Sequence, residues 1–191
     1  MVQDRIKAVP ALRLTTQRLI LRPFEMEDAL FLFGWASDPE VTRFLRFPMH
    51  ASLADSKRII TRWIDEGRRP PSFQWAVTLK ENGIPIGSIG LEIINSHDCR
   101  GEVGYCLSKE YWNQGFMTEA LKAVLGFGFN VAAFHRIEAC YSVDNPASGK
   151  VMLKAGMVRE AGPLHDYYRA DRLGYQDVMM MVALSDTYVG D

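Results

Sequence analysis

Cysteine and histidine are scarce in this sequence, and neither is spaced for a metal site or a disulfide framework. The three cysteines, Cys99, Cys106 and Cys140, are an odd number at wide spacing and form no Cys-x-x-Cys unit. The four histidines form no His-x3-His pair. Structural zinc sites and small disulfide-rich proteins need such paired spacings. We therefore expect no metal and no disulfide scaffold, and we expect the three thiols to be reduced and buried.

The sequence also has no excess of either charge and no long hydrophobic run. Its formal net charge is −1, so the molecule as a whole has no field that would attract nucleic acid or an anionic membrane. No apolar stretch approaches the roughly 20 residues that a membrane-spanning helix needs. The first nine residues include Asp4, Arg5 and Lys7 and lack the apolar core of a signal peptide. We therefore expect a cytoplasmic protein that binds neither nucleic acid nor membrane.

Linkers, repeats and low-complexity stretches are absent as well. The 191 residues are 48% apolar and 24% charged, which is ordinary for a globular protein and enough to build a sizeable core. We therefore expect a single domain over residues 1–191.

The first third of the chain is predicted to be mostly helical. A short strand over 18–22 precedes an apolar helix around 28–36. The segment Ser52-Leu53-Ala54-Asp55 resembles a capping box in which Asp replaces the usual Glu. The apolar residues behind it follow a helical period, so we expect a second helix that ends at Gly67.

The middle of the chain changes to the period of two that is typical of half-buried strands. Alternation over 73–79 predicts the first of these strands, and Asn82-Gly83 is the strongest short signal for a tight hairpin turn. The return strand, 84–95, changes phase near Gly87-Ser88, which predicts a bulge there. A third strand is expected over 101–107.

Helices and strands alternate in the second half. We expect helices over 117–131 and 145–155, a strand over 137–143 between them, and two final strands near 164–170 and 176–184. A strand–helix–strand order implies a crossover connection and a partly parallel sheet. The predicted fold is therefore mixed α/β, with a largely antiparallel central sheet of about six to seven strands and helices on both faces.

The loop over 108–115 and the helix that follows it are the first candidate site. A helix that starts directly after a glycine turn leaves several backbone N–H groups unpaired, and the macrodipole adds about half a positive charge there. Such a turn binds anions, and a pyrophosphate is its natural occupant. Gly115 would let a phosphate approach the backbone, and Thr118 could add a hydroxyl. A plain connection with one glycine looks the same, so the turn alone does not decide the matter.

Four segments, in order and at fitting distances, resemble one known family. They are TQRLILR at 16–22, EVGY at 102–105, YWNQGFMTEAL at 111–121, and NPAS at 145–148 with KAGM at 154–157. From about residue 14 to residue 184 the chain resembles the GNAT superfamily of acetyl-CoA-dependent N-acetyltransferases. Within it, the chain looks most like the Rim-type branch, which acetylates the N-terminal amines of ribosomal proteins. The resemblance implies a GNAT-like fold and an enzyme that passes an acetyl group to an amine.

The resemblance also implies that acetyl-CoA is the co-substrate and that two stretches bind it. Main-chain amides of the turn would cradle the pyrophosphate, and the end of the preceding strand would pair with the pantetheine arm. The residues concerned are Asn113, Gln114, Gly115, Phe116, Met117 and Thr118 for the turn, and Tyr105, Cys106 and Leu107 for the strand.

The turn departs from the family's pyrophosphate signature, Arg/Gln-x-x-Gly-x-Gly/Ala, at two positions. Trp112 stands at the first of them, as is common in the Rim-type branch. Met117 stands at the last, where we expect its side chain to narrow the loop while its N–H stays available.

Three residues of the second motif bear on the chemistry that the resemblance implies. Asn145 matches an asparagine that touches the cofactor near its pantetheine. Met152 stands where many GNAT enzymes have a tyrosine that protonates the departing thiolate, and methionine has no proton to give. Ser148, a serine that Rim-type enzymes share, is our candidate both for that catalytic acid and for a cofactor contact. Asn145 and Ser148 would equally suit a plain helix cap.

Transfer also needs an amine nitrogen that has lost its proton, and a carboxylate within one water of the amine can remove it. Glu102 is our candidate for this catalytic base, since it lies on the strand beside the expected acetyl site. Glu138 is a rival, and a solvated surface glutamate is the plain alternative. Cys106 raises the alternative of an acyl-cysteine intermediate. Because no histidine is placed to activate it, we favour direct transfer in a ternary complex.

The acceptor is the least determined part of the prediction. Tyr167-Tyr168 are candidates to line its groove, although aromatic strand residues are more often core, and residues 44–47 would border its entrance by the family's layout. The leading acceptor is a protein or peptide N-terminal amine; a small-molecule amine such as a polyamine is the alternative, because specificity lies in loops. Met117 and Met152 would favour a third reading, an acyl-CoA sensor without turnover. A nucleotide hydrolase is disfavoured, because the sequence has no Gly-x4-Gly-Lys-Ser/Thr loop. We also consider a homodimer.

Overall fold

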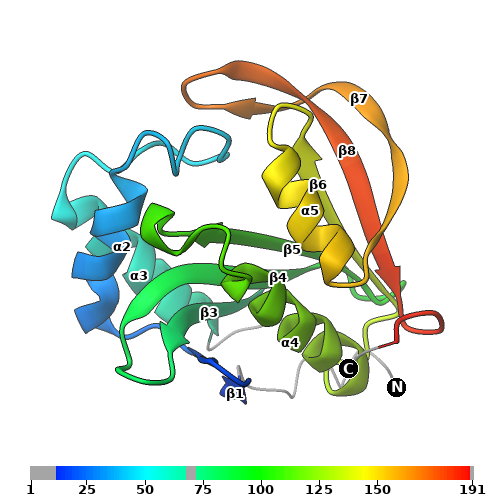
Figure 1. Cartoon of the computed structure of the whole chain (residues 1–191), viewed down its shortest axis with the longest axis horizontal. Coiled ribbons are helices and arrows are strands. Elements are labelled where there is room, and N and C mark those ends of the chain that lie inside the picture. The colour runs from blue at the N-terminus through cyan, green and yellow to red at the C-terminus, as the bar shows by residue number, and fades with distance from the viewer. Residues whose placement is uncertain (1–11, 68–71, 190–191) are drawn as a thin grey trace.

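Eight strands form one sheet at the centre of the computed structural model, which describes residues 12–67 and 72–189 (Figure 1). In the order of the sheet, the strands are β1 (Leu14–Thr15), β2 (Leu19–Arg22), β3 (Ser72–Leu79), β4 (Pro85–Asn95), β5 (Arg100–Leu107), β6 (Arg136–Ser142), β8 (Gly174–Leu184) and β7 (Val158–Ala170). The α-helices of the described residues are α2 (Ala29–Ala36), α3 (Leu53–Gly67), α4 (Phe116–Asn130) and α5 (Pro146–Lys154), and the 3-10 turns are η1 (Met26–Asp28) and η2 (Lys109–Tyr111). The predicted mixed α/β class is confirmed.

Successive strands from β1 to β5 pair antiparallel with one another, and the predicted hairpin joins β3 to β4. Gly83 has a φ of 73°, which glycine adopts without steric cost. The N–H of Leu79 donates to the carbonyl of Ile84 at 2.9 Å and closes the turn. The local Asn-Gly signal was therefore sufficient to place this turn.

A bulge follows this hairpin, close to where the phase change predicts it. Between the pairs Val77↔Gly87 and Thr78↔Pro85 the register shifts, and Ile86 is the extra residue. The bulge therefore lies one residue earlier than expected. It allows both Ile86 and Ile89, which are three residues apart, to be buried.

The sheet has a gap in its middle, because its one parallel pair is short. Strands β5 and β6 are in register over three residue pairs only, from Arg100 to Glu102 of β5. Beyond that point β5 stays paired with β4, and β6 stays paired with β8, each to its end. The facing edges of residues 103–107 and 139–142 therefore have main-chain polar groups without a strand partner across the gap.

Helices cover both faces of the sheet, as predicted, and each face has its own core. Met117, Leu121 and other side chains of α4 belong to one buried cluster, and α2 and α3 belong to a second. The period of two in β3 distributes its side chains accordingly: Trp75 and Val77 join the α4 cluster, whereas Ala76 joins the α2 cluster. Figure 1 shows α4 and α5 on the side toward the viewer.

Two strands differ from the prediction. β1 has only two residues and is absent from the predicted set, so the sheet has eight strands in place of six or seven. β7 begins at Val158, six residues before the expected start at 164. Residues 158–167 are exposed and include Gly162-Pro163. No alternation of apolar side chains therefore marks this edge strand in the sequence.

Two smaller expectations concern the thiols and the membrane. All three cysteines are free, but only Cys106 is buried, and Cys99 and Cys140 are half-buried. The prediction of three buried thiols is thus wrong for two of them. Among the helices within residues 12–67 and 72–189, none combines the length and the apolar character needed to cross a membrane.

Candidate active site

The loop between β5 and α4 ends in a left-handed residue that starts the helix. Gly115 is the N-cap of α4, with φ 81° and ψ 0°, and this conformation costs other L-residues roughly 1–2 kcal/mol. The N–H groups of Phe116, Met117 and Thr118 lie in the first turn, where no intrahelical acceptor exists for them. The positive end of the macrodipole lies at the same point. The turn thus has the form that an anion site requires.

Met117 does not obstruct this turn. Its side chain is buried in the core beneath α4, so only its backbone faces the site. The expectation that Met117 narrows the loop is therefore wrong, because the helix directs that side chain inward.

Arg18 and Glu119 brace the turn against the start of β2. The Glu119 carboxylate accepts hydrogen bonds from the Thr16 hydroxyl at 2.6 Å and from Arg18 N and Nε at 2.7 Å each. Arg18 Nη1 donates to the carbonyl of Gln114 at 3.0 Å, and the guanidinium lies 4.3 Å from the centre of the Phe116 ring. Partial burial acts to raise the pKa of Glu119, but the hydrogen bonds outweigh it and hold the pKa below its ordinary value. Sequence reasoning assigned no role to either residue.

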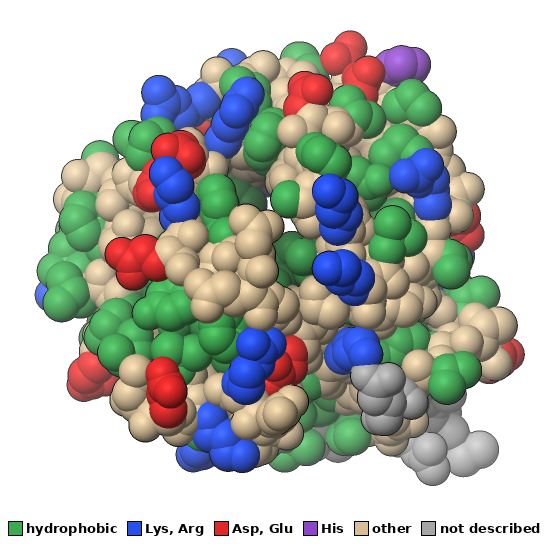
Figure 2. Space-filling model, viewed as in Figure 1, with side chains coloured by type: hydrophobic (Ala, Val, Ile, Leu, Met, Phe, Trp, Pro, Cys, Tyr) green, Lys and Arg blue, Asp and Glu red, His purple; other side chains and the backbone are tan. Residues whose placement is uncertain are grey.

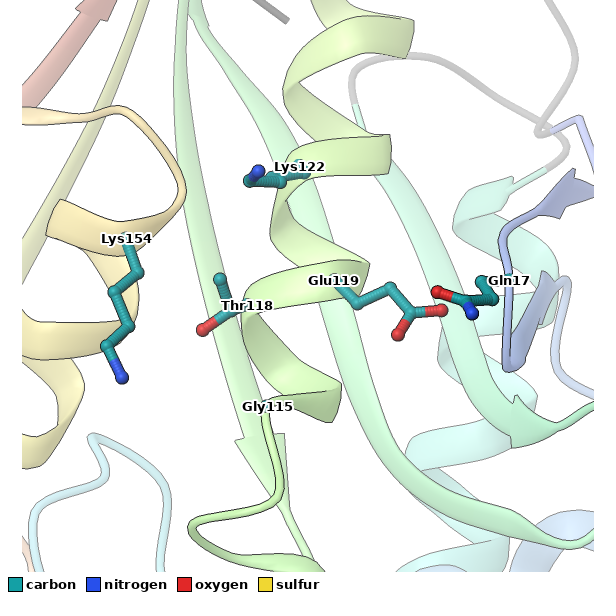
Figure 3. Close-up of a pocket in the computed structure, with 6 residues that line it drawn as sticks. All are labelled: Gln17, Gly115, Thr118, Glu119, Lys122 and Lys154. Carbon is teal, nitrogen blue, oxygen red and sulfur yellow. The ribbon is translucent and has the colours of Figure 1, made fainter. Parts of the chain in front are cut away.

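A hollow of about 290 Å³ lies beside this turn (Figure 3). Figure 3 shows Lys154 extending from α5, and Thr118 and Lys122 projecting from α4. Two ammonium groups beside a helix N-terminus suit a phosphate group. The sequence analysis gave neither lysine a role, although Lys154 belongs to the KAGM segment, since nothing local shows that α5 brings Lys154 to α4. The residues that line the hollow are Gln17, Gly115, Thr118, Glu119, Lys122 and Lys154.

Trp112 ties the loop to the end of β5. Its indole Nε1 donates to the carbonyl of Leu107 at 2.8 Å, and the Gln114 side chain donates to the carbonyl of Glu110 at 2.9 Å. Asn113 adopts a φ of 60° between them. Trp112 therefore acts as a structural tie at the position where the family signature has Arg or Gln.

The three residues predicted at the end of β5 face different ways. Tyr105 and Leu107 pack on the α4 and α5 side, whereas Cys106 is buried in the cluster of α2 and α3. Burial raises the pKa of the Cys106 thiol to about 12, so the group is protonated at neutral pH and is a poor nucleophile. Only the main chain of Cys106 is therefore available to a cofactor on the α5 side, and the acyl-cysteine alternative loses support.

Ser148 and Tyr105 form a pair beside the gap. The Tyr105 hydroxyl lies 2.9 Å from both the carbonyl and the Oγ of Ser148. Since the carbonyl can only accept, we assign the Tyr105 proton to it, which leaves the Ser148 hydroxyl proton for Tyr105 or for a ligand. Burial raises the pKa of Tyr105 far above its ordinary value, so Tyr105 serves as a neutral hydrogen-bonding group. Met152, which also belongs to α5, is buried in the core cluster below that helix.

Asn145 is the N-cap of α5, so its predicted role as a helix cap is observed. Its side chain accepts a hydrogen bond from the N–H of Ser148 at 3.4 Å, and Pro146 follows in the first turn. The cap fixes where the helix begins and therefore where Ser148 stands.

Glu102 lies at the closed end of the gap, on the face opposite Ser148. Its side chain is 37% exposed, and Oε1 lies 3.4 Å from Nη2 of Arg46. Arg46 also donates to Cys140 Sγ at 3.1 Å and lies 5.0 Å from the centre of the Tyr168 ring. The Tyr168 hydroxyl donates to the carbonyl of Phe44 at 2.8 Å. The structure thus joins segment 44–47, Tyr168 and Glu102, which the sequence could only place separately.

Glu138, the alternative candidate for the catalytic base, is already paired with two arginines. It is 7% exposed, and its Oε1 accepts from Arg100 Nη2 at 2.7 Å and from Arg136 Nε at 2.5 Å. Arg136 also pairs with Glu160 of β7. A buried carboxylate between two guanidinium groups joins strands and is expensive to release. Of the two glutamates, Glu102 is the one that a substrate can reach.

Figure 2 shows the α4 and α5 face hollowed at its centre, between α5 and the segment that precedes α4. The background is visible through this opening, and in the same view the diverging ends of β5 and β6 lie on either side of it. The gap therefore connects the Ser148 face with the Glu102 face.

These features fit a CoA thioester. The unpaired edge of β5 suits an extended ligand that has amide groups, as pantetheine has. The first turn of α4 and the two lysines suit its phosphates. Among residues 12–67 and 72–189, no three His, Cys, Asp or Glu side chains are grouped to hold a metal ion.

Comparison with known proteins identifies the family. Residues 18–158 match the acetyltransferase (GNAT) domain. The chain is 33% identical over 178 residues to the uncharacterized N-acetyltransferase p20 of Bacillus licheniformis, which covers 93% of this chain and 98% of that protein. It is 28% identical over 173 residues to the ribosomal protein uS5-alanine N-acetyltransferase of Escherichia coli, with 85% and 86% covered.

A solved structure shows the same fold. Spermidine N-acetyltransferase from Vibrio cholerae, in complex with CoA and spermine, superposes with a TM-score of 0.76 at 22% identity, covering 90% of this chain and 98% of that one. The predicted resemblance is confirmed: the chain belongs to the GNAT family of N-acetyltransferases and is an acyltransferase.

Proposed function

We propose that this enzyme transfers the acetyl group of acetyl-CoA directly to the α-amine of a peptide or protein N-terminus. The observation that carries the proposal is the gap in the sheet. It opens on one face beside Ser148 and the turn at Gly115, and on the other face beside Glu102. Two substrates can therefore meet at one point from opposite sides, and no covalent enzyme intermediate is needed.

On the first face, main-chain groups are proposed to bind most of acetyl-CoA, which supplies an acyl group activated by a sulfur leaving group. The amides from Asn113 to Thr118 would bind the pyrophosphate, with Lys122 and Lys154 beside it. The free edge of Tyr105–Leu107 would bind the pantetheine, and Asn145 would lie near the same arm. This arrangement aims the thioester carbonyl into the gap.

On the second face, Glu102 is proposed to take the proton that the amine loses on attack, directly or through one water. An α-amine has an ordinary pKa of about 8, so roughly a tenth of it is neutral at pH 7 before any help. The nitrogen bonds to the acetyl carbon as the C–S bond breaks, and the sulfur leaves with the electron pair. Ser148, oriented by Tyr105, would donate a hydrogen bond to that sulfur, since Met152 cannot.

Two acceptor classes remain, and each has a specific observation in its favour. The Escherichia coli relative acts on an alanine of ribosomal protein uS5, which favours an N-terminal α-amine. The Vibrio cholerae structure is of a spermidine acetyltransferase, and the half-exposed Glu102 carboxylate would attract a polyamine. We place the N-terminal amine first, because the Arg46 guanidinium beside Glu102 repels a polycation.

The test is a transfer assay with labelled acetyl-CoA and a panel of acceptors. The panel holds peptides with free N-termini, the same peptides with blocked N-termini, polyamines and aminoglycosides. We expect label on the free peptides only, with release of one CoA thiol per acetyl group. Label on polyamines alone, or acetyl-CoA binding without thiol release, would refute the proposal.

A further inference from the structure

Arg46 lies on the acceptor side beside Glu102, and no chemical step of the proposed reaction uses it. It comes from the segment between α2 and α3 and reaches β5 at Glu102 and β6 at Cys140. Its guanidinium lies 5.0 Å from the Tyr168 ring and 6.0 Å from the Tyr167 ring of β7. One cation therefore contacts both strands that border the gap, β5 and β6, and also the edge strand β7.

The binding capacity of this guanidinium is largely unused. Both of its polar contacts are made by Nη2, and the distance to Glu102 is 3.4 Å, longer than the 2.7–2.9 Å usual for a charged pair. The other partner, the Cys140 thiol, is a weak acceptor. Within the described ranges 12–67 and 72–189, Nη1 and Nε have no polar partner, and half of the side chain (50%) is exposed.

Arginines with a structural role look different in this molecule. Arg22 forms a two-pronged pair with Asp28, with Nη1 to Oδ2 at 2.7 Å and Nη2 to Oδ1 at 2.8 Å. Arg136 forms the same kind of two-pronged pair with the Glu160 carboxylate. These guanidinium groups are matched to a carboxylate of the protein, whereas Arg46 has only a long contact with Glu102 and half of its side chain is exposed.

We propose, building on N-terminal acetylation as the function, that Arg46 binds a carboxylate of the acceptor. The enzyme would then select N-termini that have an acidic side chain at the second residue. A guanidinium fork matches a carboxylate with two parallel hydrogen bonds. The acceptor carboxylate replaces Glu102 on Arg46, and the released Glu102 then faces the amine. Binding of the acceptor carboxylate to Arg46 and release of Glu102 from Arg46 thus occur in the same step.

The experiment uses three peptides that differ only at residue 2, which is Asp, Asn or Lys. For the wild-type enzyme we expect kcat/KM to fall about 10-fold or more from Asp to Asn and further to Lys, since a charge-assisted hydrogen bond is worth about 10- to 100-fold. Arg46→Ala should lower kcat/KM for the Asp peptide by that factor and remove the preference. Arg46→Lys keeps the charge without the fork and should give an intermediate preference.

Matched controls separate recognition from folding. Arg43→Ala removes a cation from the same segment, where the guanidinium lies 5.0 Å from the Phe44 ring, and should leave the preference intact. Acetyl-CoA affinity should be unchanged in Arg46→Ala, because Arg46 lies on the face away from Ser148.

The outcomes distinguish this inference from the proposed function. Equal kcat/KM for the three peptides, or a preference that survives Arg46→Ala, overturns the inference while N-terminal acetylation stands. If no peptide is labelled but free aspartate is, and only with Arg46 present, carboxylate recognition is supported and the peptide acceptor is overturned. If only spermidine is labelled, both fail.

Discussion

The two faces of the gap are built in different ways. On the α4 and α5 face, the candidate site consists mainly of main-chain groups: the left-handed turn at Gly115, the first-turn amides of α4 and the unpaired edge of β5. On the opposite face it consists of side chains, Glu102, Arg46 and Tyr168, from three segments far apart in the chain. The positions of main-chain groups are determined by the fold, so they stay the same as long as the fold does. Side chains can be replaced one at a time, so the acceptor can change while the cofactor site does not.

The strongest test of this contrast disrupts the cofactor face alone. Gly115→Glu places a negative charge at the anion site and an L-residue at φ 81°, so we expect acetyl-CoA affinity to fall by more than about 100-fold. Isothermal titration calorimetry measures it. Gly126→Glu is the control, because it adds the same side chain to the same helix where a Cβ meets nothing within 4 Å. Normal affinity in Gly115→Glu would show that the phosphates bind elsewhere.

The next test disrupts the acceptor face alone. Glu102→Gln should lower kcat by about 100-fold at pH 7, as loss of a general base does. The defect should shrink at pH 9, where most of an α-amine is neutral without help. Acetyl-CoA affinity, measured in parallel, should not change, and Glu81→Gln at the remote hairpin is the matched control. A Glu102→Gln enzyme with full activity would leave water as the base.

A smaller effect is expected where the two faces meet. Ser148→Ala should lower kcat by about 10-fold and leave acetyl-CoA affinity nearly intact, because it removes one hydrogen bond to the leaving sulfur. Tyr105→Phe should have a smaller effect of the same kind, since it only releases the orientation of Ser148. Steady-state kinetics of the two variants decide this point. Unchanged turnover in Ser148→Ala would place the proton donor elsewhere.

The smallest effect is expected at Cys106. This thiol has a pKa raised to about 12 by burial and lies in the α2 and α3 cluster, so Cys106→Ala should leave kcat unchanged. The small cavity should reduce stability by about 1 kcal/mol. Mass spectrometry of the wild-type protein after incubation with acetyl-CoA should find no acetyl group on Cys106. An acetylated Cys106 that passes its label to a peptide would contradict direct transfer.

The features that the sequence predicts well are those that depend on neighbours in the chain. The turn at Gly83, the start of α4 at Gly115 and the cap of α5 at Asn145 each follow from residues within one turn of structure. Strands β1 and β7 are the exceptions in the fold: β1 has only two residues, and exposed residues and Gly162-Pro163 conceal the beginning of β7.

The contacts that complete the site could not be predicted in this way. Tyr105 meets Ser148 across 43 residues, and Arg46 meets Cys140 across 94. Neither pair follows from periodicity, because each depends on how the strands are ordered in the sheet. The family resemblance placed Glu102 and Ser148 near the reaction, but it could not show that Arg46 lies on Glu102 or that Glu138 is already paired.

The three-residue junction of β5 and β6, held by Arg100 and Arg136 on Glu138, determines how far apart the free strand ends stand. The five residues of β5 beyond it extend roughly 16 Å at about 3.3 Å each. A rotation of one degree at the junction therefore displaces the far end by about 0.3 Å. The spacing of the strand ends therefore depends on Arg100, Arg136 and Glu138, which lie outside the proposed substrate contacts, and substitutions there can change the rate while every proposed contact residue stays the same.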